Sequence, residues 1–234
     1  MTLYYKNMNR RIPPPFKSII STVKPTHSPS THVLRALESW EGVTEQITFF
    51  NIENAIPWRP SKTKIKWAIP QKDPPQLIQL IAEAAQHKDD EVVAIVNSDI
   101  LLDRKVLNIN KLKALQKWRK WAATSPRWTY EGDNVNNAKI IDYGIDIFVA
   151  PGLVWQAMFE ECPPFLRMGC ILWDNWVNCW LKANIEETYV NMRPWRCVFH
   201  PVHEEGQQQN PYTKEEVDSL QFTHNGFPAR EFRI

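Results

Sequence analysis

The segment Glu91–Asn97, with the sequence EVVAIVN, constrains the fold of this chain more than any other. A near-continuous apolar run of this length is typical of a strand at the centre of a parallel sheet, because such a strand is buried on both faces. Hydrophobic residues make up 43% of the 234 residues and charged residues 23%, a composition that excludes global disorder. The chain is therefore expected to fold around a sheet with this run at its centre.

Strand and helix patterns alternate along the first hundred residues. Segments 16–21 and 46–51 have the pattern of short buried strands, and a helix is predicted to begin near Thr31. Apolar residues recur at helical spacing over 77–84, directly before the central run. Residues 55–75, rich in Pro and Lys, are expected to form a loop. Strands that alternate with helices predict a doubly wound α/β sheet.

The second half of the chain continues this pattern and adds a tryptophan-rich segment. Residues 142–151 are expected to form a strand and residues 152–161 a helix. Trp173, Trp176 and Trp180 follow at a spacing that places them on one face of a further helix. The α/β pattern therefore extends over most of the chain.

We expect a single domain over residues 1–234, with residues 1–15 as an N-terminal arm and 207–234 as a C-terminal tail. No apolar run approaches the roughly 20 residues of a membrane span. The N-terminus also lacks the apolar core of a signal peptide. The expected location is the cytoplasm, or the host cytoplasm for a viral protein, with no membrane partner.

Basic residues are distributed unevenly, although the formal net charge is only +2. Residues 104–130 contain no acidic side chain, and neither do residues 1–37 or 54–72. If these stretches converge, they form an electropositive surface that fits nucleic acid; the alternative is a solvated helix face with scattered lysines. The residues expected to contact nucleic acid are Lys117, Arg119, Lys120 and Arg127.

Asp99 follows the central strand in the sequence Asn97-Ser98-Asp99. Ligands of open α/β sheets bind at the carboxyl ends of the strands, so this carboxylate is well placed to hold a divalent cation against a diphosphate. A helix-capping or turn aspartate is the alternative interpretation.

Asp174 lies at the predicted start of the tryptophan-rich helix. The helix dipole stabilises a carboxylate there, so this residue is either a capping group or a general base presented to a pocket. If it only caps the helix, the base is expected at Asp142, Asp146 or His203. Farther along, His200 and His203 follow a strand-like segment and could supply an imidazole ligand to a metal, with a surface loop as the alternative.

Four segments together resemble small glycosyltransferases of the GT-A fold. They are the strand that runs into STVKP at 21–25, the run VVAIVNSDILLD, the segment from YGIDIFVAP to PPFLRMGCILWDNW, and the histidines near residue 200. The second resembles the acidic metal-binding motif of the family, usually Asp-x-Asp, with Asn97 in its first position. The resemblance covers about residues 16–205.

The resemblance implies a Rossmann-like, doubly wound mixed sheet and transfer of a sugar from a nucleotide sugar, most simply a UDP-sugar. It implies Mn²⁺ or Mg²⁺ held by Asp99 and by His200 or His203, with Asp174 as the catalytic base. The residues that it implies for donor binding are Thr22, Lys24, Asn97, Ser98, Trp173 and Trp176.

The acceptor is a separate question. Relatives of this type include enzymes of phages and kinetoplastids that glycosylate hydroxymethylated pyrimidines in DNA. The basic stretches favour double-stranded DNA with hydroxymethylated bases as the acceptor. The alternatives are a transferase that acts on a polysaccharide, lipid or protein, and a GT-A-like nucleic-acid-binding module without activity.

Overall fold

The computed structural model describes residues 14–22, 31–51, 58–71, 74–103, 107, 109–132, 134–170, 172–185, 188–202 and 211–220. Lys24 and His203 lie outside these residues, as do residues 1–13 of the predicted arm and most of the predicted tail.

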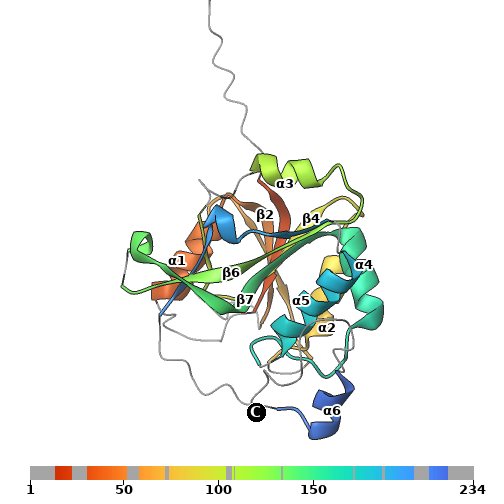
Figure 1. Ribbon diagram of the computed structural model, residues 1–234. Helices are drawn as coiled ribbons and strands as arrows, with labels where there is room; N and C mark the ends of the chain where they lie inside the picture. Colours follow the sequence, from red (N-terminus) through yellow and green to blue (C-terminus); the bar gives the residue numbers. More distant parts are fainter. Residues whose placement is uncertain are drawn as a thin grey trace, which may run out of the picture.

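The described strands form one mixed sheet of nine strands, in the order β3-β2-β1-β4-β7-β6-β9-β5, with β8 paired to β6 (Figure 1). The strands are β1 Phe16–Ser21, β2 Thr44–Phe50, β3 Lys64–Ala68, β4 Val92–Val96, β5 Leu101–Leu102, β6 Ala122–Tyr130, β7 Lys139–Pro151, β8 Tyr189–Asn191 and β9 Val198–Pro201. β1, β2, β3 and β4 are parallel, whereas β7 is antiparallel to both β4 and β6. The predicted central strand is confirmed as β4, with all five of its residues buried.

Helices cover both faces of the sheet. They are α1 Thr31–Trp40, α2 Leu77–Ala85, α3 Ile109–Leu115, α4 Gly152–Glu161, α5 Trp173–Asn184 and α6 Lys214–Ser219. α2, α4 and α5 lie side by side on one face, and α1 lies on the other (Figure 1). Each face has its own core: Leu80, Trp155 and Trp180 belong to the first, and Leu37 and Trp40 to the second. This is the predicted doubly wound α/β architecture.

The chain reverses its direction of winding between β1 and β4. β2 and β3 continue from one side of β1, while β4 lies on its other side. At the carboxyl ends of this pair, the Ser21 hydroxyl donates a 2.6 Å hydrogen bond to the Val96 carbonyl. In α/β sheets a crevice at such a switch point is where ligands bind. The candidate site is therefore sought at this edge.

Three strands fall where none was predicted. β3 lies within the expected loop 55–75, the short β5 follows Asp99, and β6 lies within the basic stretch 104–130. β6 contains Pro126, which lacks an N–H group, and the pairing register of β6 with β7 shifts on both sides of that residue. The irregularity divides β6 into one half that pairs with β8 and another that pairs with β9.

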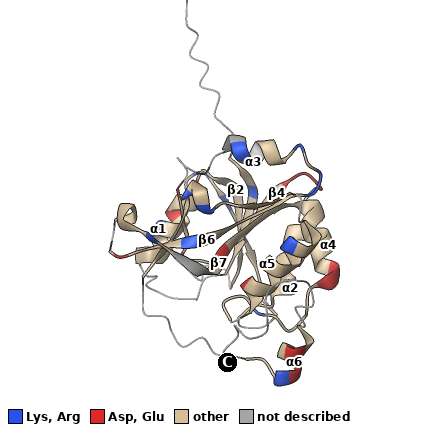
Figure 2. Cartoon of the chain, in the orientation of Figure 1, with Lys and Arg blue, Asp and Glu red and all other residues tan. Residues whose placement is uncertain are grey.

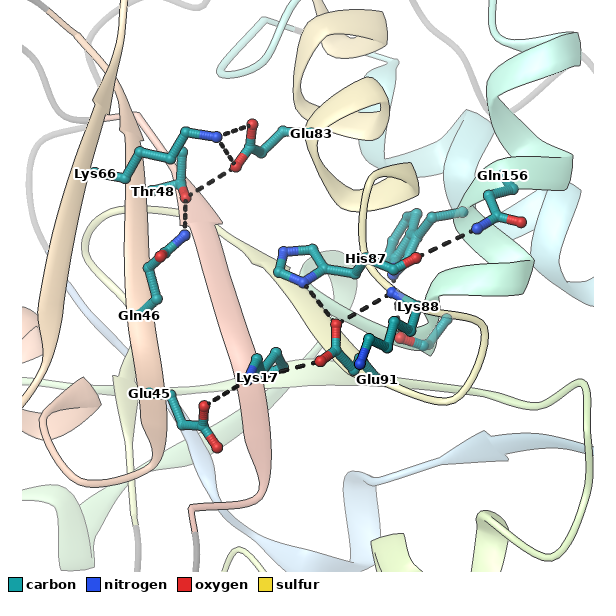
Figure 3. Close-up of polar contacts among 12 residues, drawn as sticks. Lys17, Glu45, Gln46, Thr48, Lys66, Glu83, His87, Lys88, Glu91 and Gln156 are labelled. Atoms are coloured by element: carbon teal, nitrogen blue, oxygen red, sulfur yellow. Dashed lines mark hydrogen bonds and ion pairs between the residues drawn. The ribbon is translucent and has the colours of Figure 1, made fainter.

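The amino ends of the parallel strands carry charged side chains in pairs. Lys17 on β1 contacts Glu45 at 2.8 Å and Glu91 at 3.6 Å. Farther along the sheet, Lys66 on β3 binds Glu83 of α2 at 2.6 Å (Figure 3). The contacts of Lys17 therefore link the starts of β1, β2 and β4, and the Lys66–Glu83 pair links β3 to α2. No helix of the described chain is long and apolar enough to cross a bilayer.

Candidate functional site

Acidic and basic side chains from four parts of the chain gather at the carboxyl end of β4. Asp99 follows β4, Arg127 lies on β6, Asp146 lies on β7 and His200 lies on β9. β7 pairs with β4 so that Ile147 is opposite Val96, which places Asp146 beside Asn97 at the strand end. Sequence-distant residues thus meet at the edge where a ligand is expected.

Asp99 and His200 form a pair. The His200 Nε2 atom lies 3.3 Å from Asp99 Oδ2, and the two side chains are 7% and 23% exposed, respectively. The sequence prediction placed both residues in a metal site, and the fold brings them within contact distance. The other predicted histidine, His203, lies outside the described residues.

Asp146 is the most deeply buried carboxylate of this cluster, at 4% exposure. Its Oδ1 atom accepts a 2.6 Å hydrogen bond from the Asn97 amide, and its Oδ2 atom lies 3.8 Å from Arg127. Burial raises the pKa of Asp146; Arg127 and His200 oppose this effect, and the charge of Asp99 adds to it.

The contact with Asp146 explains why an amide stands at position 97. A carboxylate at this position would face a second carboxylate at hydrogen-bond distance, and like charges in a buried site repel strongly. Asn97 instead donates to Asp146. The first position of the acidic motif therefore serves the internal structure of the site.

Asp174 occupies the first turn of α5, two residues after the N-cap position. The N-cap residue is Leu172, whose φ of 76° lies in the left-handed region that few non-glycine residues adopt. Burial raises the pKa of Asp174 to about 6, and the charge of Asp146 adds to the rise. Backbone N–H groups of Asn175 and Ile145 hydrogen-bond to the carboxylate and limit the shift. Asp174 thus lies in the first turn of α5 and borders the charged cluster that contains Asp146.

Trp173 and Trp176 lie in the hydrophobic core. They are 3% and 9% exposed, and the Trp173 ring packs edge-on against Phe148 at 5.5 Å. The prediction of one shared helix face is confirmed by this packing. Their predicted role of lining a donor pocket stays a prediction; in this helix Asp174 borders the charged cluster.

Thr22 and Ser98 lie at the ends of β1 and β4. The Thr22 hydroxyl is 3.3 Å from the Phe50 carbonyl and 3.4 Å from Asn51 Oδ1, so it links the ends of β1 and β2. Ser98 is half-buried in the turn after β4. Both residues lie at the carboxyl ends of these strands, where donor binding was predicted, and their predicted role stays a prediction.

The predicted nucleic-acid residues separate into two places. Arg127 is only 14% exposed and belongs to the charged cluster beside Asp146, and its guanidinium lies next to Gly144. Lys117, Arg119 and Lys120 lie before the start of β6, which is separated from β4 by β7 and runs in the same direction as β4: Ala123 is opposite Val149 of β7, which is opposite Ala94 of β4. The three surface residues thus lie at the edge opposite Asp99. Across the chain, Lys and Arg are spread over α3, β6, α5 and α6 (Figure 2).

The described residues include no group of three or more His, Cys, Asp or Glu side chains arranged to hold a metal ion. Asp99 and His200 offer one carboxylate and one imidazole side by side. Two protein ligands suffice for a cation only where a substrate, such as a diphosphate, supplies the others. The donor set therefore fits a cation that arrives together with its substrate.

Asp146 entered the sequence prediction only as an alternative base, should Asp174 be a cap. A signal for it exists in the sequence, because an aspartate interrupts the apolar strand at Ile145-Asp146-Ile147, and unpaired aspartates are rarely buried. Arg127 gave no such signal, because its partner lies on a different strand.

No family model and no curated protein matches the chain. Among solved structures, S. aureus TarS 1-349 superimposes with a TM-score of 0.54 at 12% identity, over 79% of this chain and 60% of that one. A putative glucose-1-phosphate thymidylyltransferase from Bacillus anthracis (TM-score 0.48, 11% identity, 91% and 97% coverage) and a cytidylyltransferase from Francisella tularensis (0.42, 8%, 87% and 97%) overlap more loosely. The α/β fold of this chain is thus similar to that of the TarS fragment.

Proposed function

We propose that the protein is a glycosyltransferase that moves a sugar from a nucleotide sugar, most simply a UDP-sugar, to a hydroxyl acceptor. The observation that carries the proposal is the gathering of Asp99, His200, Asp146 and Asp174 at the carboxyl end of β4. This cluster lies at the carboxyl ends of the sheet strands, where Thr22, Asn97 and Ser98 are the proposed donor contacts. Lys24 remains a proposed donor contact from the sequence.

Asp174 is the proposed general base. It would take the proton of the acceptor hydroxyl while that oxygen attacks the anomeric carbon and the nucleoside diphosphate leaves. A carboxylate with a pKa of about 6 is ionised at neutral pH and is more basic than an ordinary aspartate. A single displacement of this kind inverts the anomeric centre.

Asp99 and His200 are the proposed protein ligands of Mn²⁺ or Mg²⁺. A cation there would offset the charge that grows on the leaving diphosphate. Asp146 keeps its contacts with Asn97 and Arg127. Its charge acts on the proposed metal ligands and on Asp174. His203 stays a proposed further ligand on sequence grounds.

For the acceptor we propose the hydroxymethyl group of a modified pyrimidine in DNA. The acid-free basic stretches of the sequence support this choice. A transferase that acts on a polysaccharide, lipid or protein would use the same donor chemistry. A GT-A-like nucleic-acid-binding module without activity would transfer no sugar.

The test is release of nucleoside diphosphate from a panel of nucleotide sugars, with and without Mn²⁺ and hydroxymethylated DNA, followed by mass spectrometry of the DNA nucleosides. Asp99→Asn and Asp174→Asn should lose turnover, whereas Asp218→Asn, an exposed acid on α6, should keep it. Pyrophosphate release from nucleoside triphosphates and sugar phosphates would refute the proposal in favour of nucleotidyl transfer. Donor turnover without DNA modification would leave a glycosyltransferase with another acceptor.

A further inference from the structure

A hollow of about 360 Å³ lies at the opposite edge of the sheet from the candidate site. It is lined by Trp118, Arg119, Lys120, Ala183, Asn184, Ile185 and Thr188. Two segments enclose it: the turn before β6 and the end of α5. The Thr188 hydroxyl donates a 2.6 Å hydrogen bond to the Lys120 carbonyl and ties the two segments together.

The lining combines an exposed aromatic ring with cations. The Trp118 side chain is 49% exposed, which is unusual for a large apolar group, and Lys117 Nζ lies 5.2 Å from its ring centroid. Among the described residues that line the hollow, none is acidic. Asp89 lies 3.6 Å from Arg119, but both of these side chains are largely exposed, so the pair is weak.

α5 connects this hollow to the candidate site. Asp174 lies in the first turn of the helix, and Ala183 and Asn184 are its last two residues. Ten residues of α-helix span about 15 Å, so the hollow lies roughly that far from the proposed base. A small acceptor could not contact both places at once, whereas a polymer of a few units could.

Indole rings and cations together are the chemistry that binds nucleic-acid strands. Bases stack on aromatic side chains whatever their identity, and Lys and Arg hold the phosphates beside them. We propose that this hollow is an anchoring subsite that holds one nucleotide of a nucleic-acid acceptor, while a nucleotide farther along the strand reaches Asp174. This inference rests on the proposed function for its link to the reaction, but strand binding itself can be measured without donor.

The test is fluorescence anisotropy of a labelled 12-nucleotide strand, and of the same strand in a duplex, with donor absent. Trp118→Ala should weaken strand binding roughly ten- to a hundredfold, the usual effect of removing one stacking platform. Ala183→Glu places a carboxylate at the rim on an exposed helical position and should weaken binding similarly. Ala183→Gln, which has nearly the same shape, should bind like the wild type, as should Lys214→Ala on α6. Melting temperatures identify any variant that fails to fold, and the two positions test the hollow independently.

Donor turnover separates this inference from the proposed function. Trp118→Ala should still release nucleoside diphosphate from the donor with water as acceptor. The anchoring role is overturned if the wild-type protein binds no strand at low salt, or if Trp118→Ala and Ala183→Glu both bind as the wild type does. It is also overturned if a sulfated polysaccharide competes fully while the ring makes no difference, since charge alone would then explain binding.

Discussion

Asp174→Asn should abolish turnover and stabilise the protein at the same time. As the proposed base, Asp174 contributes roughly 10²- to 10⁴-fold to the rate, and an amide cannot take its proton. The stability gain follows from the buried charge. The pKa of this carboxyl rises from 3.8 to about 6 in the folded chain, which corresponds to roughly 3 kcal/mol of destabilisation when the group is ionised.

The direction in which folding stability changes with pH tests whether the buried charge of Asp174 is the cause of the expected stability gain. Because the folded pKa is raised, the folded wild-type protein holds more protons than the unfolded chain between about pH 4 and pH 6, and its stability falls as the pH rises through that window. The variant lacks this group, so its stability should fall less over that window; Asp146, whose pKa burial also raises, contributes to the fall in both proteins. Its advantage should be absent at pH 4 and complete above pH 7, where 3 kcal/mol corresponds to roughly 6–12 °C in Tm for a chain of this size.

Urea or thermal unfolding at pH 4, 5.5 and 8 measures this difference, beside donor turnover at pH 8. Asp218→Asn on α6 is the matched control and should change neither quantity. A variant that is less stable than the wild type at pH 8 would show that the hydrogen bonds from Asn175 and Ile145 outweigh the burial of the charge. Full turnover in that variant would remove Asp174 from the reaction.

Three further outcomes are expected. Asp99→Asn should abolish turnover with a Tm shift of only a few degrees, and activity that survives both this change and EDTA would exclude a cation from the reaction. Asp146→Asn should move the acidic limb of the pH–turnover profile to lower pH, because the charge of Asp146 helps to raise the pKa of Asp174; an unmoved limb would show that the two acids do not interact. Neutralising Lys117, Arg119 and Lys120 together should weaken DNA binding and flatten its salt dependence by up to about 0.9 in log–log slope for each phosphate that these side chains neutralise, and an unchanged slope would assign them to a solvated surface.

Much of the fold could be predicted because its strands and helices carry strong periodic patterns. The run 91–97 and the helix 152–161 appear in the structure nearly as expected. β3 was missed because its sequence KIKWA alternates lysines with apolar residues at a sheet edge, inside a Pro-rich stretch. β6 was missed because Pro126 and the charged Arg127 lie within it, and only pairing with three neighbouring strands makes it a strand.

The candidate site was predictable where a residue's role follows from its place in an element. Asp99 after a buried strand and Asp174 at a helix start are of this kind. Arg127 and Asp146 are different, because they act through a contact between two strands whose register no local pattern specifies. The basic residues were the least predictable, since charge density in sequence does not reveal which side chains already have acidic partners, as Lys17 and Lys66 do.

The hydrogen bond between Asn97 and Asp146 makes two positions, 49 residues apart, depend on each other during evolution. Replacing Asn97 by Asp alone would set two carboxylates against each other, whereas replacing Asp146 by Asn alone would keep an acceptor for the Asn97 amide but remove the negative charge that faces Arg127. Exchanging both would restore one donor and one acceptor, so the double change should be tolerated better than the sum of the single ones, by about 0.5–3 kcal/mol for groups in direct contact. A lineage can therefore pass between an aspartate and an asparagine at position 97 most readily when position 146 changes as well, and its history at these two sites should be one of paired substitutions.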